Sequence, residues 1–255
     1  MGWEGEILSA FKYRIFRKRT VPGRYMVSRE GKNSLDWRAL TASYGIKEMC
    51  RMLFWPMKFS KESNRLREIT NRGHELGVHG YVHVKWNCLN QNEMEMEFHE
   101  MISAYENIFQ EKPTGFSAPL AFENDDVNRL LDKYAFKYCS VMSGNEIQHP
   151  PDNDSRFSHV AIPVTIKMTD LYIPPIEFFH TSGFSEQEII DRMKALIDKE
   201  MEQKGWASTF LHARNEGVKY LKSFEMMLIH IREQGYRVKT FYDICSDFKE
   251  SLRNN

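Results

Sequence analysis

Apolar and polar residues follow two periods along the chain, and these periods predict helices and short strands in succession from residue 60 onward. Apolar positions three and four residues apart are typical of amphipathic helices, whereas short β-branched or aromatic runs are typical of strands. We predict helices over residues 61–73, 90–112, 124–136, 185–205, 217–235 and 241–252. We predict strands over residues 75–80, 115–119, 137–142, 159–166, 207–213 and 236–240. Strands that alternate with helices indicate an α/β fold with a parallel sheet, either open or closed into a barrel.

Several helix ends carry their own sequence signals. Asn124 is a predicted N-cap, and Ser185 and Glu188 have the spacing of a capping box. Gly73 and Gly205 follow the last apolar positions of two helices, where glycine commonly ends a helix. The apolar positions of the 90–112 helix include Met94, Phe98, Met101, Ile102, Tyr105 and Ile108. We expect this face to enter the core.

The composition favours one folded domain over residues 1–255. An apolar fraction of 42% is enough for a large core, and α/β barrels reach 255 residues as a single unit. Lysine and arginine together equal aspartate and glutamate at 35 each, so no net charge indicates nucleic acid. The four cysteines form no C-x-x-C pair, and the start resembles no secretory signal. We therefore expect a reduced, cytoplasmic setting.

The first 60 residues are basic, with twelve Lys and Arg against five Asp and Glu. Within residues 7–19, apolar side chains form one helical stripe beside a cluster of cations. The stripe consists of Ile7, Leu8, Phe11 and Ile15. This pattern is typical of a helix that contacts an anionic membrane surface, and it predicts peripheral membrane contact. The alternative is an ordinary helix that covers a barrel and exposes a basic face to solvent.

Two histidines four residues apart are the main chemical signal. His79 and His83 lie in the stretch "GHELGVHGYVHVKWN", and on one helical turn they can share a divalent ion. Imidazole suits zinc or cobalt, and manganese more weakly. An isolated pair at this spacing is more often a buried strand residue and a surface residue. However, His79, Pro119 and His212 all fall at predicted strand ends, where the chemistry of α/β barrels gathers.

Three stretches in order, "RGHELGVHGYVHVKWN", "GFSAP" and "TFLHARNEG", resemble the polysaccharide deacetylase (NodB-homology) family. Within it, they are most similar to the deformylases of undecaprenyl-phosphate-linked 4-formamido-arabinose. The best match covers residues 60–245, and residues 1–59 form a divergent basic helical region. The resemblance implies a distorted (β/α) barrel and a metal-dependent hydrolase that removes a formyl or acetyl group from an amino sugar.

The resemblance also assigns roles to individual residues. His79 and His83 correspond to the two metal-binding histidines, for zinc, manganese or cobalt, and His212 corresponds to the histidine that protonates the leaving amine. The implied substrate-binding residues are Tyr81, Ser117, Pro119 and Asp170. For Asp170, a solvated aspartate in a loop is an equally good interpretation. The implied substrate is an amino sugar, lipid-linked in the deformylase branch, which would place the protein in the cytoplasm or on the inner face of the membrane.

The sequence departs from the family pattern before His79. The family opens with a strand that ends in two aspartates, one the catalytic base and the other a metal ligand, and no counterpart precedes His79 here. The branch also carries charged residues where this chain has Val82 and Phe122, and a glutamate where it has Arg214. The family's third motif carries an arginine at the position of Ser117, a change that the branch tolerates. We therefore expect a barrel that lacks its first strands and a metal that is bound weakly or not at all. The alternative function is a catalytically inactive, truncated relative that binds a carbohydrate or a partner subunit.

Overall fold

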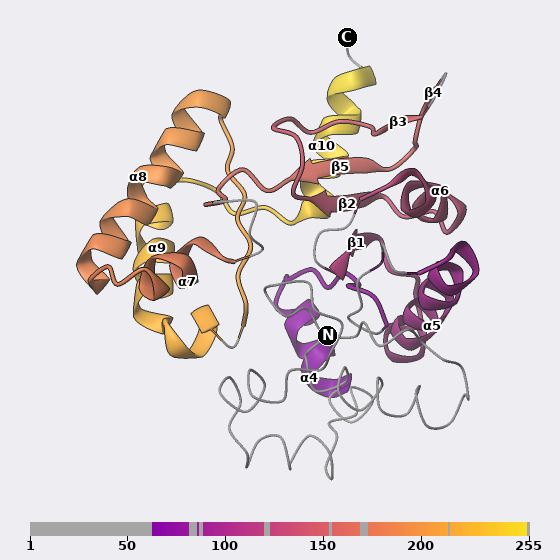
Figure 1. Cartoon of the computed structure of the whole chain (residues 1–255), viewed down its shortest axis with the longest axis horizontal. Helices are drawn as coiled ribbons and strands as arrows, with labels where there is room; N and C mark the ends of the chain where they lie inside the picture. Colours follow the sequence, from indigo (N-terminus) through magenta and orange to yellow (C-terminus); the bar gives the residue numbers. More distant parts are fainter. Residues whose placement is uncertain are drawn as a thin grey trace. The chain divides into compact units, whose positions relative to one another are not determined.

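The structure, a computed structural model, describes most of the chain from residue 63 onward (Figure 1). The described residues are 63–81, 86, 89–119, 123–152, 155–168, 173–213 and 215–253. The predictions for residues 1–59, including membrane contact through residues 7–19, lie outside this part of the chain and stay predictions.

The chain divides into two compact units. The first combines the residues up to Cys139 with His149–Val160, and the second combines Ser140–Gln148 with Ala161–Asn255. Elements of the first unit are α4 (Ser63–Asn71), α5 (Gln91–Phe109), β1 (Gly115–Ser117), α6 (Asp125–Lys133), β3 (Pro151–Asp152) and β4 (Ser155–Arg156). Elements of the second unit are α7 (Pro175–Thr181), α8 (Glu186–Lys204), the π-helix η4 (Asn215–Lys219), α9 (Leu221–Glu233) and α10 (Phe241–Arg253). The division runs through β2 (Tyr138–Val141) and β5 (Val160–Pro163).

The strands β1, β2 and β5 form a sheet in that order. The amide of Val160 donates to the carbonyl of Lys137, and the amide of Val164 donates to the carbonyl of Val141. Both strands therefore advance in the same direction, so β2 and β5 are parallel. The α/β fold with a parallel sheet is confirmed. Within the described residues the sheet does not close on itself, and the distorted barrel stays a prediction.

Helix α5 builds the core of the first unit. It begins at a capping box in which the Asn90 side chain accepts from the Glu93 amide and the Glu93 carboxylate accepts from the Asn90 amide. All six of its predicted core positions are buried. The Phe98 ring stacks on Phe116 at 5.3 Å and meets the fully buried Trp86 ring edge-on at the same distance. This aromatic cluster holds β1 against the helix.

Gly115 begins β1 where no side chain fits. A Cβ atom at this position would lie 2.0 Å from the Tyr138 hydroxyl and 2.1 Å from the ring carbon that carries it. The Tyr138 ring is itself fixed, because it is buried and its hydroxyl donates to the Glu75 carboxylate at 2.6 Å. The contact between β1 and Tyr138 therefore requires a residue without a side chain at position 115.

We expect Gly115→Ala to lower the free energy of unfolding by about 1–3 kcal/mol, the usual cost of overpacking a core. Urea denaturation followed by tryptophan fluorescence would measure this loss. Gly217→Ala is the control, because a Cβ atom there would meet nothing within 4 Å. Equal stability of the Gly115→Ala protein and the parent chain would contradict the packing around Tyr138.

A buried histidine joins the end of α6 to the strand that enters β5. The His159 side chain is fully buried, and its Nδ1 donates to Asp132 Oδ1 at 2.8 Å. The Asp132 carboxylate also accepts from the amide and the hydroxyl of Ser158. Burial alone would raise the pKa of Asp132, but these hydrogen bonds outweigh it, and the pKa lies below its ordinary value of 3.8.

We expect Asp132→Asn to lower the free energy of unfolding at pH 7 by about 1–3 kcal/mol, because the hydrogen bonds here go to a charged group. The folded-state pKa is depressed, so the contribution is fully present above the unfolded-state pKa and is lost as the pH falls through the folded-state pKa. Urea titrations at pH 7 and pH 3 should show the gap between variant and parent narrowing in acid. Exposed Asp191→Asn serves as the control, and a gap that widens in acid would contradict this account.

The second unit packs α7, α8 and α9 around one apolar cluster (Figure 1). Helix α8 begins at the predicted capping box, in which Ser185 and Glu188 bond reciprocally, and it ends at Gly205, with φ +74°. The cluster consists of Ile166, Ile176, Phe179, Ile189, Met193, Ile197, Tyr220 and Met227. These contacts fix α7 beside the start of α9, which matters for the site below.

Three predicted strands are wrong. Residues 75–80 contain only an isolated bridge, at Val78. Residues 207–213 and 236–240 are described, and neither forms a strand. In the first segment, Ser208 bonds to neighbouring backbone through its side chain as well as its main chain, which replaces a regular ladder. In the second, Val238 is 79% exposed, and only Tyr236 packs against the apolar cluster of the second unit. The helix α7 and the hairpin β3–β4 were not predicted.

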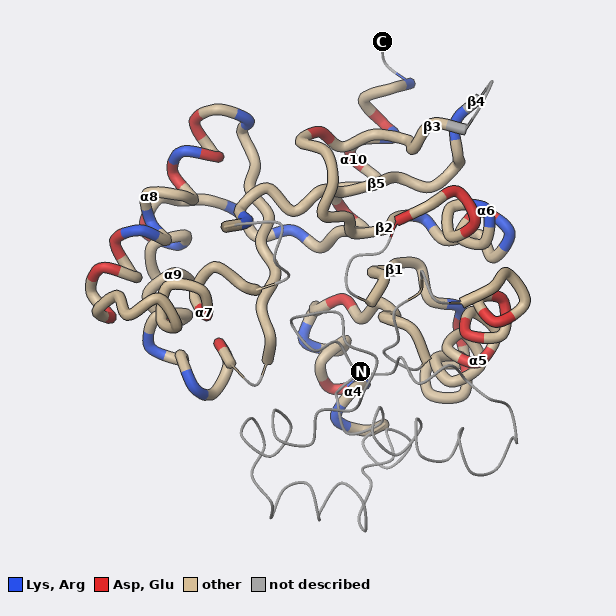
Figure 2. The backbone as a smooth tube through the Cα atoms, viewed as in Figure 1, with Lys and Arg blue, Asp and Glu red and all other residues tan. Residues whose placement is uncertain are grey.

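Charge is distributed differently on the two longest helices. Figure 2 shows acidic residues alone on α5, whereas both signs are interspersed on α8. Glu95 of α5 pairs with Lys133 of α6, so part of this acidic face ties the two helices together. None of the helices in the described residues combines the length and the apolar character needed to cross a membrane.

Candidate active site

His79 lies directly after a strand-like segment of the first unit. The amide of Val78 donates to the carbonyl of Gly115, and the amide of Ser117 donates to the carbonyl of Val78, so Val78 forms a parallel bridge with Phe116 of β1. Val78 is buried, and the next residue, His79, is partly exposed. Residues 75–80 thus form no regular strand, but His79 directly follows a residue that pairs with β1.

The His79 ring is oriented by the backbone of β1. Its Nδ1 lies 2.7 Å from the carbonyl oxygen of Ser117. Because a carbonyl oxygen can only accept, Nδ1 carries the hydrogen and Nε2 carries the lone pair of the neutral ring. Metal-binding histidines show the same arrangement, with one ring nitrogen committed to an acceptor and the other available to the ion.

The chain turns immediately after His79. Gly80 adopts φ +80°, a left-handed conformation that favours glycine. The amide of Tyr81 then donates to the Glu97 carboxylate of α5 at 3.1 Å, and the Tyr81 side chain is 45% exposed. His83 lies outside the described residues, so its pairing with His79 stays a prediction.

The predicted substrate residues of the first unit lie on and just after β1. Ser117 is partly exposed, and its carbonyl contacts His79 as described above. Pro119 is buried. The structure thus brings Ser117 to His79, through the main chain, while the predicted substrate contacts of Tyr81, Ser117 and Pro119 stay predictions. Asp170 lies outside the described residues.

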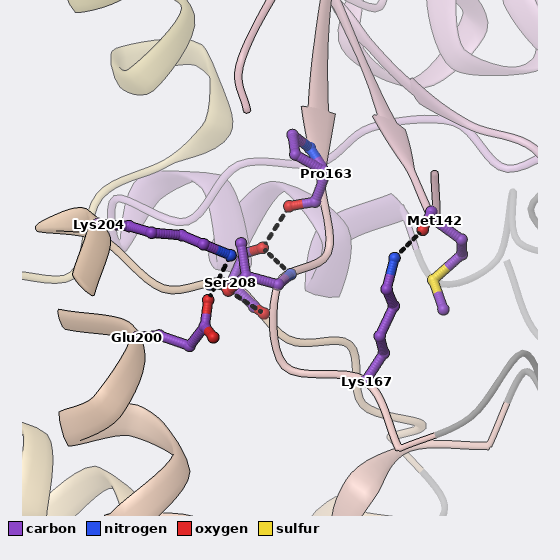
Figure 3. Close-up of polar contacts among 7 residues, drawn as sticks. Met142, Pro163, Lys167, Glu200, Lys204 and Ser208 are labelled. Atoms are coloured by element: carbon purple, nitrogen blue, oxygen red, sulfur yellow. Dashed lines mark hydrogen bonds and ion pairs between the residues drawn. The ribbon is translucent and has the colours of Figure 1, made fainter. Parts of the chain in front are cut away.

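In the second unit, Ser208 fixes the segment that leads to His212 (Figure 3). Its hydroxyl donates to the Pro163 carbonyl at 2.6 Å, and its carbonyl accepts from the amides of Thr165 and Ile166. The same figure shows Lys167 donating to the Met142 carbonyl and Lys204 paired with Glu200 of α8. His212 therefore follows a segment tied to the end of β5.

The His212 ring meets a carboxylate that the sequence analysis missed. Its Nδ1 lies 3.5 Å from Glu177 Oε2 of α7, and the same oxygen accepts from the Asn215 side chain at 2.8 Å. The neighbouring His212 ring lowers the pKa of Glu177; burial opposes this effect and the hydrogen bond from Asn215 adds to it. Glu177 is therefore ionised at neutral pH and faces a ring that is 43% exposed.

A second carboxylate holds the His212 backbone. Oε2 of Glu216 accepts from the His212 amide at 2.7 Å, and the amides of Asn215 and Glu216 donate to the His212 carbonyl. Glu216 is 1% exposed, and its Oε1 has no hydrogen-bond partner among the described residues. Burial raises the pKa of Glu216, against the opposing effect of the His212 amide. The pKa of Glu177 is thus lowered and that of Glu216 is raised, because the surroundings of the two carboxylates differ.

Glu216 and Glu177, which the sequence did not identify as site residues, differ in how strong their sequence signals were. Glu216 follows His212 by four residues in "HARNEG", so a local contact was a reasonable expectation. Glu177 lies 35 residues earlier and carries no local motif, and only the packing of α7 brings it to the ring. The described residues contain no group of three His, Cys, Asp or Glu side chains that could hold a metal.

Comparison with known proteins gives a consistent family. Residues 38–139 match the family model for polysaccharide deacetylase. The chain is 24% identical to the peptidoglycan deacetylase of Helicobacter pylori, over 73% of this chain and 74% of that protein. It is 26% identical to a probable 4-deoxy-4-formamido-L-arabinose-phosphoundecaprenol deformylase of Wigglesworthia glossinidia brevipalpis, over 62% of this chain and 54% of the relative.

Solved structures show the same fold. A probable polysaccharide deacetylase from Pseudomonas aeruginosa has a TM-score of 0.58 at 18% identity, over 73% of this chain and 63% of that one. The Puue allantoinase has a TM-score of 0.60 at 18% identity, with the same coverage. These comparisons confirm the resemblance that the motifs indicated: residues 38–139 match the polysaccharide deacetylase model, and the chain is similar to a peptidoglycan deacetylase in sequence and to a probable polysaccharide deacetylase in fold.

Proposed function

We propose that the protein is a metal-dependent hydrolase that removes a formyl or acetyl group from an amino sugar. The bond broken is the carbon–nitrogen bond of a linear amide. Water supplies the hydroxyl group of the acid product, and the sugar is released as a free amine. The observation that carries the proposal is the 2.7 Å contact between His79 Nδ1 and the Ser117 carbonyl, because it commits the ring to the tautomer that a metal ligand needs.

The chemistry of the donor set fits a divalent ion. His79 supplies an imidazole Nε2 lone pair, and His83 is the second imidazole of the proposed site, four residues further along the chain. Zinc and cobalt suit two imidazoles, with manganese weaker. When bound, such an ion supplies Lewis-acid polarisation of the amide carbonyl.

His212 is proposed to supply the proton that the amine needs. An amide nitrogen is a poor leaving group until it is protonated, and imidazole is well suited to donate a proton near neutral pH. The His212 ring is partly exposed and lies beside an ionised carboxylate. The proposal requires this ring to reach the amide nitrogen of a bound sugar.

The relatives narrow the substrate class. One relative is named a peptidoglycan deacetylase and another a deformylase of a lipid-linked amino sugar, so both names specify an acylated amino sugar. We propose the same class here, with Tyr81, Ser117, Pro119 and Asp170 as substrate-binding residues. A lipid-linked substrate would give residues 7–19 a role at the membrane.

The direct test is turnover by the purified chain with zinc, manganese or cobalt supplied. N-formyl and N-acetyl amino sugars would be incubated with the protein, and released formate, acetate and free amine would be measured by NMR. We expect release that depends on the ion and stops when a chelator is added. Absence of release from protein that holds one ion per chain would contradict the hydrolase.

A second candidate is a relative that binds a carbohydrate or a partner subunit without turnover. The observation that favours it is the loss of charge at Val82, Ser117 and Phe122 and its reversal at Arg214. Binding of the same sugars, measured by calorimetry, without product would support this candidate over the enzyme.

A further inference from the structure

We propose that Glu97 of α5 is a positioning residue for the turn that follows His79: its carboxylate holds the backbone at Tyr81. The value of this turn for metal binding rests on the function proposed above, whereas the contact itself does not. The observation behind the proposal is the hydrogen bond, 3.1 Å long, that the Tyr81 amide donates to Glu97 Oε2.

The turn is held at both of its ends. At the first end, Nδ1 of His79 donates to the Ser117 carbonyl of β1. At the second end, the Tyr81 amide donates to Glu97 of α5. Gly80 lies between them at φ +80°, and glycine has more backbone freedom than any other residue. The bond to Glu97 therefore limits the one part of the turn that the strand does not fix.

The same stretch of α5 also contacts the chain beyond His83. Phe98, the neighbour of Glu97, meets the fully buried Trp86 ring edge-on at 5.3 Å. In the sequence, His83 lies between Tyr81 and Trp86. Two adjacent residues of one helix thus hold the chain shortly before and shortly after the second histidine of the proposed metal site.

Helix α5 is a suitable support for this turn. It begins at a capping box, and its apolar face, which includes Met94 and Met101, is buried in the first unit. Glu97 itself is only partly buried, so its replacement should leave this packing intact. The helix therefore supplies a fixed carboxylate without depending on that carboxylate for its own place.

A fixed turn matters for metal affinity because ordering a flexible segment costs conformational entropy. Where the protein has already ordered the segment, binding of the ion does not bear that cost. Residues that support metal ligands in this way commonly influence affinity without touching the ion. We assign Glu97 this role, and not that of a ligand.

The first test is titration of the metal-free full chain with zinc, followed by calorimetry. In Glu97→Ala we expect an affinity about 10–100-fold below that of the parent, the usual cost of losing such a support. Glu97→Gln keeps an oxygen that can accept from the Tyr81 amide, and it should retain most of the affinity. Glu100→Ala is the matched control: it removes a carboxylate from the same helix and should leave the affinity unchanged.

A folded Glu97→Ala protein with the zinc affinity of the parent would overturn the proposal. Equal losses in Glu97→Ala and Glu97→Gln would also overturn it, because they would assign the effect to charge and not to the hydrogen bond. If circular dichroism shows that Glu97→Ala does not fold, Glu97→Leu takes its place, since leucine favours the helix and has no acceptor.

Exchange of the Tyr81 amide hydrogen, followed by NMR in the metal-free chain, tests the contact without any ion. We expect this exchange to be on the order of 10-fold faster in Glu97→Ala than in the parent, because the amide loses a charged acceptor. A parent chain that binds no zinc but shows this difference would contradict the proposed metal site and support Glu97 as the residue that holds the turn. Equal exchange in the two proteins would overturn the role of Glu97.

Discussion

Replacing His79 with alanine should lower the affinity of the chain for zinc by more than about 100-fold. Loss of a residue that only hydrogen-bonds a metal ligand already lowers metal affinity by ~10–100-fold, and loss of the ligand itself should cost more. The structure assigns the reason to one atom. Nδ1 of His79 donates to the Ser117 carbonyl, so Nε2 is the nitrogen that the proposed ion would bind. Titration of the purified protein with zinc, followed by calorimetry, measures the change.

The control for this prediction lies on the same segment. His74→Ala removes an exposed histidine five residues earlier and should leave the zinc affinity as it is. Equal affinity in the parent chain and in His79→Ala would remove His79 from any metal site. Weakening by both variants alike would indicate non-specific binding to surface imidazoles.

Replacing His212 with glutamine should lower kcat by about 10²–10⁴-fold, the range that loss of a positioned acid produces. Zinc content should remain unchanged, because His212 is proposed to act on the proton and not on the ion. Steady-state kinetics with the best acylated sugar, together with metal analysis of the same preparation, would measure both quantities.

This result also has a matched control. His99→Gln changes an exposed histidine of α5 and should leave the kinetics intact. A His212→Gln protein with unchanged kcat would contradict the acid role, and one that loses its zinc would reassign His212 to the metal.

Elements with strong local signals were predictable from the sequence. Helix α5 has a sustained apolar period and a capping pair at Asn90 and Glu93, and its predicted core face is buried throughout. Helix α8 has a capping box at one end and Gly205 at the other. In such elements the local preference agrees with the tertiary packing, so the pattern of residues was sufficient.

Short elements that depend on tertiary contacts were not predictable in the same way. Helix α7 has only seven residues and begins at a proline, and the apolar cluster of the second unit determines its place. The segment at Ser208 has the apolar character of a strand, but its hydroxyl and its amide bond to Pro163 and Thr165 instead. Periodicity does not report side-chain bonds of this kind.

In the candidate site, too, local features were predictable from the sequence and tertiary contacts were not. The pairing of the residue before His79 with the sheet was predictable, because a short apolar run before a histidine is a local feature, although this run forms only an isolated bridge. The bond of His79 to the Ser117 carbonyl depends on the parallel pairing of Val78 with β1, which no spacing in the sequence specifies. The contact between Glu177 and His212 likewise joins two distant segments through the packing of α7.

The measurement that tests the proposed metal site most directly is anomalous X-ray scattering from crystals of the protein grown with zinc. We predict one strong peak at about 2.0–2.1 Å from Nε2 of His79, the usual zinc–nitrogen distance, and at a similar distance from a ring nitrogen of His83. Nδ1 of His79 should still donate to the Ser117 carbonyl in that crystal. A fully occupied zinc ion bound elsewhere, with no peak at His79, would contradict the account.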